Sequence, residues 1–108
     1  MSLPSDISVA ELKRMRDAQT DFTLLDVRDD DELATAAITG ALHIPMPEVP
    51  ARLQDVPSDG DVVVMCHSGG RSERVATYLR QNGYASVANL AGGIDAWSQQ
   101  IDSSVPRY

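Results

Sequence analysis

The chain has 108 residues, of which 43% are hydrophobic and 23% are charged, as is typical of one soluble globular domain. Its net charge of −7 disfavours non-specific binding to nucleic acid and docking on anionic membranes. The single cysteine excludes a disulfide-stapled secreted scaffold. The sequence does not begin with a signal-peptide pattern, and its longest apolar run, of five residues, is too short to span a membrane, so we expect a cytoplasmic protein.

The first half of the chain alternates helical and strand patterns. Ser8 and Glu11 have the spacing of a capping box, which predicts the start of a helix. The four carboxylates from Asp29 to Glu32 predict the solvated start of a second, short helix, because the helix dipole favours negative charge there. In chain order, the predicted elements are a helix over 9–18, a buried strand over 23–27, the short helix from 29, a strand over 41–44 after a turn at Gly40, and a short helix over 48–55.

The second half contains the clearest strand pattern. Residues 62–66 are apolar on both faces, as in a parallel sheet that is covered on both sides. The remaining predicted elements are a loop over 67–70, a helix over 71–82 that ends at Gly83, a strand over 86–90, a turn at Gly92 and Gly93, a helix over 94–100 and a tail over 101–108. Together they predict a single α/β domain over residues 1–108, with its core at about 7–100. Its mostly parallel central sheet should have about five strands, with helices on both faces.

The strand that ends at Cys66 is followed by a loop whose residues could form a reactive site. A thiolate is the reactive form of cysteine, and its pKa falls at a helix N-terminus and near arginine. Gly69 and Gly70 permit a tight curl in which successive backbone amides form a cradle for negative charge. Arg71 and Arg74 would add positive charge at the rim. The alternative is an ordinary core cysteine followed by a glycine turn, and the combination of strand, glycine loop, arginine and helix favours a reactive site.

Four segments of the chain resemble, in order, the motifs of the single-domain rhodaneses, a family of sulfurtransferases. Two departures stand out: Ala36 and Ala37 occupy positions where the family usually has Gly-His, and His67 stands where many relatives carry arginine. We expect activity to survive the first departure, because those positions are not the nucleophile; the second removes one fixed positive charge from the loop, and we expect it to bear on donor preference. The matching segments are residues 66–72 (Cys-His-Ser-Gly-Gly-Arg-Ser, the family's Cys-x-Ser-Gly-x-Arg-Ser loop), residues 25–28 with Glu32, residues 38–45, and residues 89–97 with their Gly-Gly-x-x-x-Trp pattern.

The resemblance implies a rhodanese-like fold and a reaction. A sulfane sulfur would move from a donor such as thiosulfate to a nucleophilic acceptor (cyanide, a thiol or a sulfur-carrier protein) through a persulfide on Cys66. No metal and no organic cofactor is implied. The tail resembles that of rhodanese domains fused to adenylating enzymes for ubiquitin-like sulfur carriers, which favours a carrier protein as acceptor. The cradle for the persulfide would comprise His67, Ser68, Gly69, Gly70, Arg71 and Ser72.

Other polar residues have simpler interpretations. Asp26 and Arg28 are candidates for supporting residues near the site; the favoured interpretation is that Asp26 bonds loop backbone and Arg28 pairs with a nearby carboxylate. His67 is either a proton shuttle or a loop residue that contributes only its amide, and the second is favoured. His43 and Trp97 are expected to be structural. Ser72 either caps the following helix or donates into the cradle.

Two other functions remain open. Cysteine-type phosphatases, and arsenate reductases of similar chemistry, also combine a strand, an anion loop and an arginine. Their Cys-x-x-x-x-x-Arg pattern has five intervening residues, whereas four separate Cys66 from Arg71. A loop of this length suits one sulfur atom better than a phosphoryl group. A non-catalytic regulatory module of the same fold is the second alternative, although such modules usually lack the cysteine.

Overall fold

A five-stranded parallel sheet forms the centre of the molecule in this computed structural model, which describes residues 2–108. The strand order is β1-β5-β4-β2-β3, so the apolar strand β4 lies in the middle. This confirms the predicted α/β class and parallel sheet. The strands are β1 (Asp6–Ile7), β2 (Phe22–Asp26), β3 (Leu42–His43), β4 (Asp61–Met65) and β5 (Val87–Leu90), and the helices are α1 (Val9–Asp17), α2 (Asp30–Thr35), α3 (Gly70–Gln81) and α4 (Gly93–Gln100).

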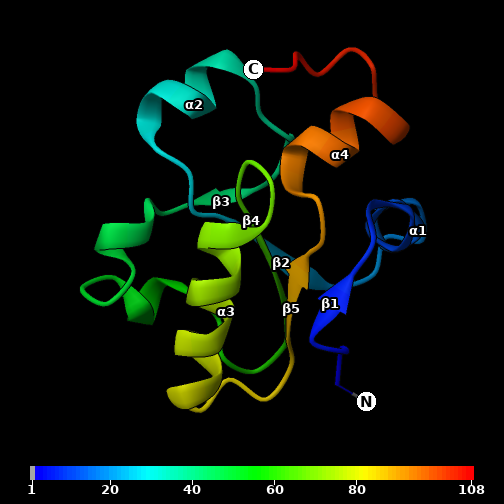
Figure 1. Cartoon of the computed structure of the whole chain (residues 1–108). Helices are drawn as coiled ribbons and strands as arrows, with labels where there is room; N and C mark the ends of the chain where they lie inside the picture. Colours follow the sequence, from blue (N-terminus) through cyan, green and yellow to red (C-terminus); the bar gives the residue numbers. More distant parts are fainter. Residues whose placement is uncertain (1) are drawn as a thin grey trace.

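Helices cover both faces of the sheet, as predicted (Figure 1). Alternate residues of β4 supply both cores: Val62 and Val64 pack with α3 on one face, whereas Val63 and Met65 pack with α1 and α4 on the other. Trp97 of α4 is buried in the second core, which confirms its structural role. Because β4 is apolar on both sides, it is held rigidly, and the loop that follows it starts from a fixed point.

Local signals set the helix ends. Ser8 accepts from the backbone amide of Glu11, and the Glu11 carboxylate accepts from the Ser8 amide, so the capping box is confirmed. Gly83 follows α3 with a φ of +90°, the left-handed conformation that ends a helix at little cost for glycine.

Two expectations about local structure were wrong or incomplete. Strand β1 was not predicted, because only Ile7 of its two residues is buried and a pattern needs more positions. The helix expected over 48–55 is instead two short 3₁₀ turns, Met46–Glu48 and Leu53–Asp55. Pro50 lies inside the expected helix, where its ring and missing amide prevent continuation. The predicted domain begins at Met1, which lies outside the described residues.

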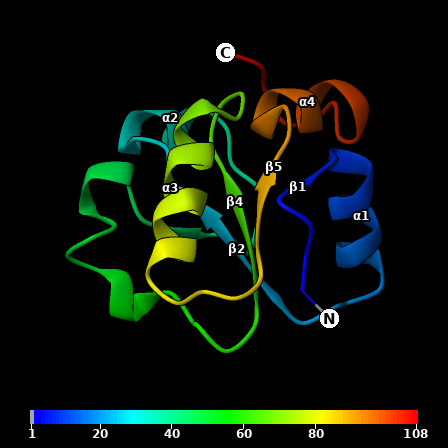
Figure 2. The same cartoon turned by 60° about the horizontal axis from the view of Figure 1, so that its bottom comes forward.

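The tail over 101–108 is folded back onto the molecule. The Ser98 hydroxyl donates to the carbonyl of Val105, and Arg107 pairs with Asp95 at 3.0 Å. Figures 1 and 2 show this segment running from α4 toward α2, at the end of the sheet where the strands finish. The last residues of the chain therefore lie beside the loop that follows β4.

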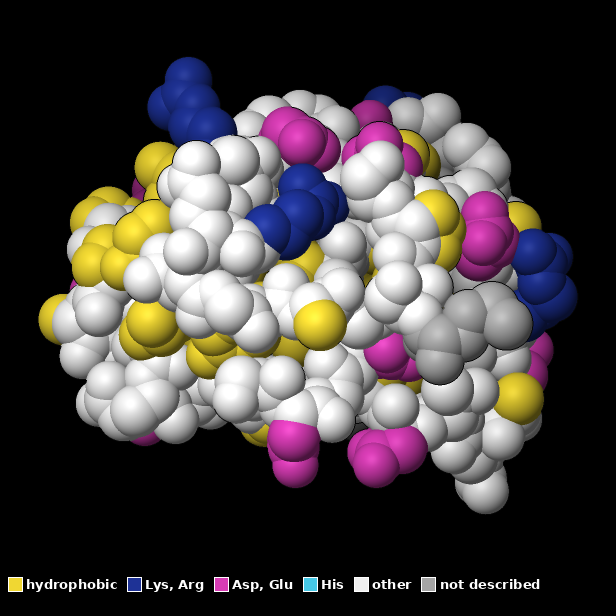
Figure 3. Space-filling view, turned by 90° about the horizontal axis from the view of Figure 1, so that it is seen from below, with side chains coloured by type: hydrophobic (Ala, Val, Ile, Leu, Met, Phe, Trp, Pro, Cys, Tyr) yellow, Lys and Arg dark blue, Asp and Glu magenta, His cyan; other side chains and the backbone are white. Residues whose placement is uncertain are grey.

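The opposite end of the sheet has a different character. In the view from below, Lys and Arg side chains are scattered among Asp and Glu side chains rather than gathered into one patch (Figure 3).

Within residues 2–108, every helix is too short or too polar to cross a membrane.

Candidate active site

Cys66 lies immediately after β4, with only 1% of its surface exposed. Its sulfur accepts a hydrogen bond from the Gly69 amide at 3.1 Å and lies 3.2 Å from the Ser72 hydroxyl. Gly69 is the N-cap of α3 and has a φ of +117°, a conformation that side chains strongly disfavour. The curl at Gly69 turns the amides at the start of α3 toward the sulfur.

The surroundings of Cys66 act on its pKa in opposite directions. Burial raises the pKa of the thiol, whereas hydrogen bonds from the Ser72 hydroxyl and from the amides of Ser72, Gly69 and Ser68 lower it. The hydrogen bonds prevail, so the pKa lies below its ordinary value. This direction agrees with the expectation drawn from the glycine loop, and it favours the nucleophilic thiolate.

The carbonyls of the same loop are held by α4. The amides of Ile94 and Asp95 each donate at 3.0 Å, to the carbonyls of Cys66 and His67 respectively. Gly93 makes this approach possible: a Cβ at that position would lie 2.5 Å from each of the two carbonyl oxygens. With its carbonyls bound on one side, the loop presents its amides to the sulfur on the other.

The Ser72 hydroxyl faces the Cys66 sulfur, and the N-cap of α3 is Gly69 rather than Ser72. Its side chain is fully buried, and its hydroxyl lies 2.5 Å from the Asn89 carbonyl oxygen as well as near the Cys66 sulfur. Asn89 is a residue that sequence reasoning did not single out. The signal was available, because Asn89 is a polar residue within an otherwise apolar buried strand.

Arg71 does not offer a free positive charge at the rim. Its guanidinium forms a two-pronged ion pair with Glu32, at 2.6 and 2.9 Å. The Arg71 hydrogen bonds, together with those from Tyr108 and the Asp29 amide, outweigh partial burial and lower the pKa of Glu32 to about 2. The expectation of a solvated run of acids is therefore wrong for Glu32, whose side chain is only 16% exposed.

Asp26, the last residue of β2, forms a buried ion pair with Arg28, two residues further along the chain. The Arg28 guanidinium donates to both carboxylate oxygens of Asp26, at 2.9 and 2.7 Å, and its backbone amide donates to the same carboxylate. Both side chains are fully buried. These are the contacts of the favoured interpretation, in which Asp26 bonds loop backbone and Arg28 meets a carboxylate.

Tyr108 joins the Asp26–Arg28 pair to Glu32 and to the cysteine loop. Its hydroxyl accepts from Arg28 at 3.0 Å and donates to Glu32 at 2.8 Å. Its ring meets the His67 ring edge-on, with centroids 4.3 Å apart. Among residues 2–108, the buried Nδ1 of His67 has no hydrogen-bond partner. Nothing in the sequence near Cys66 indicates that a residue 42 positions later reaches this site.

The second histidine lies apart from the sulfur. His43 Nε2 is 2.6 Å from the carbonyl of Arg28 and thereby ties β3 to the segment after β2. In the part of the chain that the structure describes, no three or more His, Cys, Asp or Glu side chains gather as a metal site.

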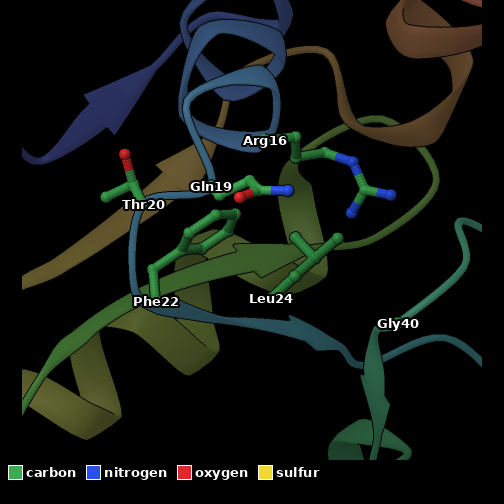
Figure 4. Close-up of a pocket in the computed structure, with 6 residues that line it drawn as sticks. All are labelled: Arg16, Gln19, Thr20, Phe22, Leu24 and Gly40. Carbon is green, nitrogen blue, oxygen red and sulfur yellow. The ribbon is translucent and has the colours of Figure 1, made fainter.

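A pocket of about 260 Å³ lies elsewhere, between the end of α1 and the start of β2 (Figure 4). None of the residues that line it was predicted to belong to the site. Phe22 begins β2, whereas the site lies beyond the other end of that strand. The lining residues are Arg16, Gln19, Thr20, Phe22, Leu24 and Gly40.

Comparison with known proteins places the whole core in one family. Residues 8–100 match the family model described as rhodanese-like domain. A protein of Allochromatium vinosum named sulfurtransferase is 44% identical over 87 residues, which cover 81% of this chain and 80% of that protein. The thiosulfate sulfurtransferase GlpE of Tolumonas auensis is 36% identical over 74 residues, covering 68% of this chain and 70% of the relative.

Solved structures agree with the sequence comparison. The human single-domain sulfurtransferase TSTD1 superposes with a TM-score of 0.78 at 28% identity, covering 90% of this chain and 97% of that one. The topology, the order of the four motifs and these relatives all point the same way, and the chain belongs to the rhodanese-like domain family.

Proposed function

We propose that this protein is a sulfurtransferase that carries a sulfane sulfur as a persulfide on Cys66. The observation that carries the proposal is the position of the Cys66 sulfur, buried at the base of a loop whose Gly69 amide and Ser72 hydroxyl both face it. A thiolate held in this way is a nucleophile. The same ring of donors would stabilise negative charge on the outer sulfur of a persulfide, as preorganised donors do in an oxyanion hole.

The reaction divides into two balanced displacements. The Cys66 thiolate attacks the outer sulfur of thiosulfate; a new S–S bond forms, the S–S bond of thiosulfate breaks, and sulfite leaves with its electron pair. Cyanide then attacks the outer sulfur of the persulfide, thiocyanate leaves, and Cys66 is again a thiolate. Neither half needs an external electron or proton, and ping-pong kinetics are expected.

Thiosulfate is the proposed donor for two reasons. The relative from Tolumonas auensis is a thiosulfate sulfurtransferase. A dianion also suits a concave loop of backbone amides, which bind negative charge without a fixed cation. Cyanide and small thiols are the proposed test acceptors. The resemblance of the tail to domains fused to adenylating enzymes makes a sulfur-carrier protein the proposed larger acceptor.

The state of Arg71 favours sulfur transfer over phosphoryl transfer. A phosphatase of the cysteine type needs its loop arginine to bind the oxygens of the phosphoryl group. Here both prongs of the Arg71 guanidinium are taken by Glu32. Four residues rather than five also separate Cys66 from Arg71, which tightens the loop around the sulfur.

The decisive experiment compares the wild type with Cys66→Ser. Incubation of the wild type with thiosulfate should add one sulfur atom to its intact mass, and cyanide should remove that atom as thiocyanate. Cys66→Ser should fold and show neither change, because no other thiol is present in the chain. An aryl phosphate assayed with the same preparations is the specificity control.

Three outcomes would overturn the proposal. Sulfur transfer by Cys66→Ser would remove Cys66 from the mechanism. Hydrolysis of aryl phosphate that depends on Cys66 would favour the phosphatase interpretation. A wild type that forms no adduct with thiosulfate and produces no thiocyanate would favour a non-catalytic module.

A further inference from the structure

Asn89 stands out as a polar side chain inside an apolar strand. It lies on β5 between Ala88 and Leu90, all three are buried, and only 6% of Asn89 is exposed. An amide buried at this position must find partners, because an unpaired one costs more than a hydrogen bond gains. Its partners are two parts of the cysteine loop and the neighbouring strand.

The orientation of the Asn89 amide is determined by those partners. Its Nδ2 donates to the Gly69 carbonyl and to the Asp6 carboxylate, each at 3.3 Å. The reverse orientation would point the amide oxygen at two other oxygens, which repel it. The Asn89 oxygen therefore faces Ser72, and the 2.5 Å separation shows that the Ser72 hydroxyl can donate to it.

The hydroxyl of Ser72 has two acceptors and one proton. When Cys66 is a neutral thiol, its S–H can donate to the Ser72 oxygen while the Ser72 proton goes to Asn89. When Cys66 is a thiolate, the sulfur can accept a hydrogen bond from the Ser72 hydroxyl only if that hydroxyl stops donating to Asn89. We propose that Asn89 is a positioning residue that competes with the Cys66 sulfur for the single proton of the Ser72 hydroxyl.

This competition would act on both half-reactions of the proposed function, on which the catalytic part of the inference rests. In the first half, fewer hydrogen bonds to the thiolate reduce the fraction that is ionised at neutral pH. In the second half, Cys66 departs as a thiolate, and a leaving thiol of lower pKa departs faster. Asn89 would therefore restrain the ionised sulfur in both steps.

Charged and titratable groups on the surrounding elements lie around the same loop, and Tyr108 meets it through the His67 ring. Their positions do not depend on the Ser72 proton, so they form a constant background in the comparison below, except that Asp6 loses a donor when Asn89 is replaced. They are Arg71 on α3 with its partner Glu32 on α2, His67 in the loop, Asp95 on α4, Asp6 on β1, and the Asp26–Arg28 pair at β2.

The test is a double-mutant cycle read by the pH dependence of Cys66 alkylation with iodoacetamide. Asn89→Val replaces the amide with an apolar, strand-compatible side chain. In the wild-type background it should lower the pKa of Cys66 by about 0.5–1 pH unit, because the Ser72 proton is freed for the thiolate. In a Ser72→Ala background the same substitution should produce no shift.

The sign of the shift separates this proposal from a purely structural role. If Asn89 served only to hold Gly69 in place, its loss would weaken the Gly69 amide bond to the sulfur and raise the pKa. A raised pKa, or an equal shift in both backgrounds, would overturn the proposal. The lost donor to Asp6 is common to both backgrounds and cancels in the cycle. If Asn89→Val does not fold, Asn89→Ala is measured in its place and carries the same two outcomes.

The outcome does not depend on sulfurtransferase activity. Alkylation reports the acidity of the thiol whether or not the protein turns over thiosulfate. Failure of the proposed function would appear as an absent sulfur adduct in the wild type, whereas failure of this inference would appear as the wrong sign, or the wrong background dependence, of the alkylation shift.

Discussion

The starts of α3 and α4 are built alike and used differently. Each follows a central strand of the sheet, and each begins after a glycine in the left-handed conformation, Gly69 with a φ of +117° and Gly92 with +82°. At α3, the amides turn toward the Cys66 sulfur. At α4, the amides of Ile94 and Asp95 donate to carbonyls of the loop before α3.

The difference shows that the partner of the amides decides how a helix start is used: the α3 amides face a sulfur, whereas the α4 amides are occupied by backbone carbonyls. Both helix starts carry the same partial positive charge. Only at α3 do the amides face a cysteine sulfur instead of backbone carbonyls. The hydrogen bonds from α4 hold the carbonyls of the α3 loop in this arrangement. The second helix start therefore acts as the support of the first.

The largest expected effect comes from breaking that support. Gly93→Ala would place a Cβ 2.5 Å from the carbonyl oxygens of Cys66 and His67, so the loop and α4 must move apart. We expect a loss of about 3 kcal/mol or more in the free energy of unfolding, as for overpacking against rigid backbone. Thermal and urea unfolding would measure it, and the depressed pKa of Cys66 should be lost together with the stability.

The matched control for Gly93→Ala is Gly40→Ala. Gly40 also has a positive φ, of +88°, but its Cβ would meet nothing within 4 Å. Gly40→Ala should lower the free energy of unfolding only by the conformational cost of a positive φ, about 1–2 kcal/mol. Equal losses in the two variants would mean that the contact between α4 and the loop is not what Gly93 protects.

An intermediate effect is expected from the ion pair in the first turn of α3. The pKa of Glu32 is lowered to about 2, below its unfolded value, so the pair adds stability above about pH 4.3 and loses it as the pH falls toward 2. Glu32→Gln should therefore cost about 1–2 kcal/mol at pH 7 after allowance for solvent screening. Its deficit relative to the wild type should shrink as the pH falls toward 2.

Asp95→Asn is the corresponding change at α4. Asp95 also lies in a first turn and pairs with an arginine, but Arg107 is 61% exposed and the pair is open to solvent. Urea unfolding at pH 7 and pH 3 should show a small loss of stability that shrinks at the lower pH, because the hydrogen bond from Arg107 lowers the pKa of Asp95. A pH-dependent deficit as large as that of Glu32→Gln would contradict the distinction between the two helix starts.

The smallest expected effect concerns the sulfur alone. Ser72→Ala removes the side-chain hydrogen bond that lowers the pKa of Cys66, and should raise that pKa by about 1 pH unit. Alkylation rate against pH measures the change. Ser98→Ala, which removes a buried hydroxyl from α4 instead, should leave the profile of Cys66 where it is.

Apart from the fold class itself, the features that the sequence predicted correctly are mostly local. The capping box at Ser8, the apolar run of β4 and the helix stop at Gly83 depend on residues within a few positions of one another. The same holds for the depressed pKa of Cys66, because most of its causes lie within six residues of the sulfur. Short-range geometry follows from short-range sequence.

The features that the sequence did not reveal depend on contacts between distant segments. Glu32 and Arg71 are 39 positions apart, and the pairing turned an expected free cation into a neutralised one. Ser72 and Asn89 come together because β5 lies beside β4 in the sheet, an order that the pattern of strands alone does not specify. Strand β1 has too few buried residues to leave a pattern of its own.

The position of Tyr108 has a practical consequence for labelling and capture. Tyr108 touches His67 and bonds Arg28, so a fluorophore, an affinity tag or a surface linker attached after it would start at the mouth of the cysteine loop. Leu3, by contrast, bonds Ser86 just before β5, at the opposite end of the sheet. Attachment on the side of Leu3 leaves the loop clear, whereas attachment beside Tyr108 would place a reporter next to His67 and so next to the cysteine loop.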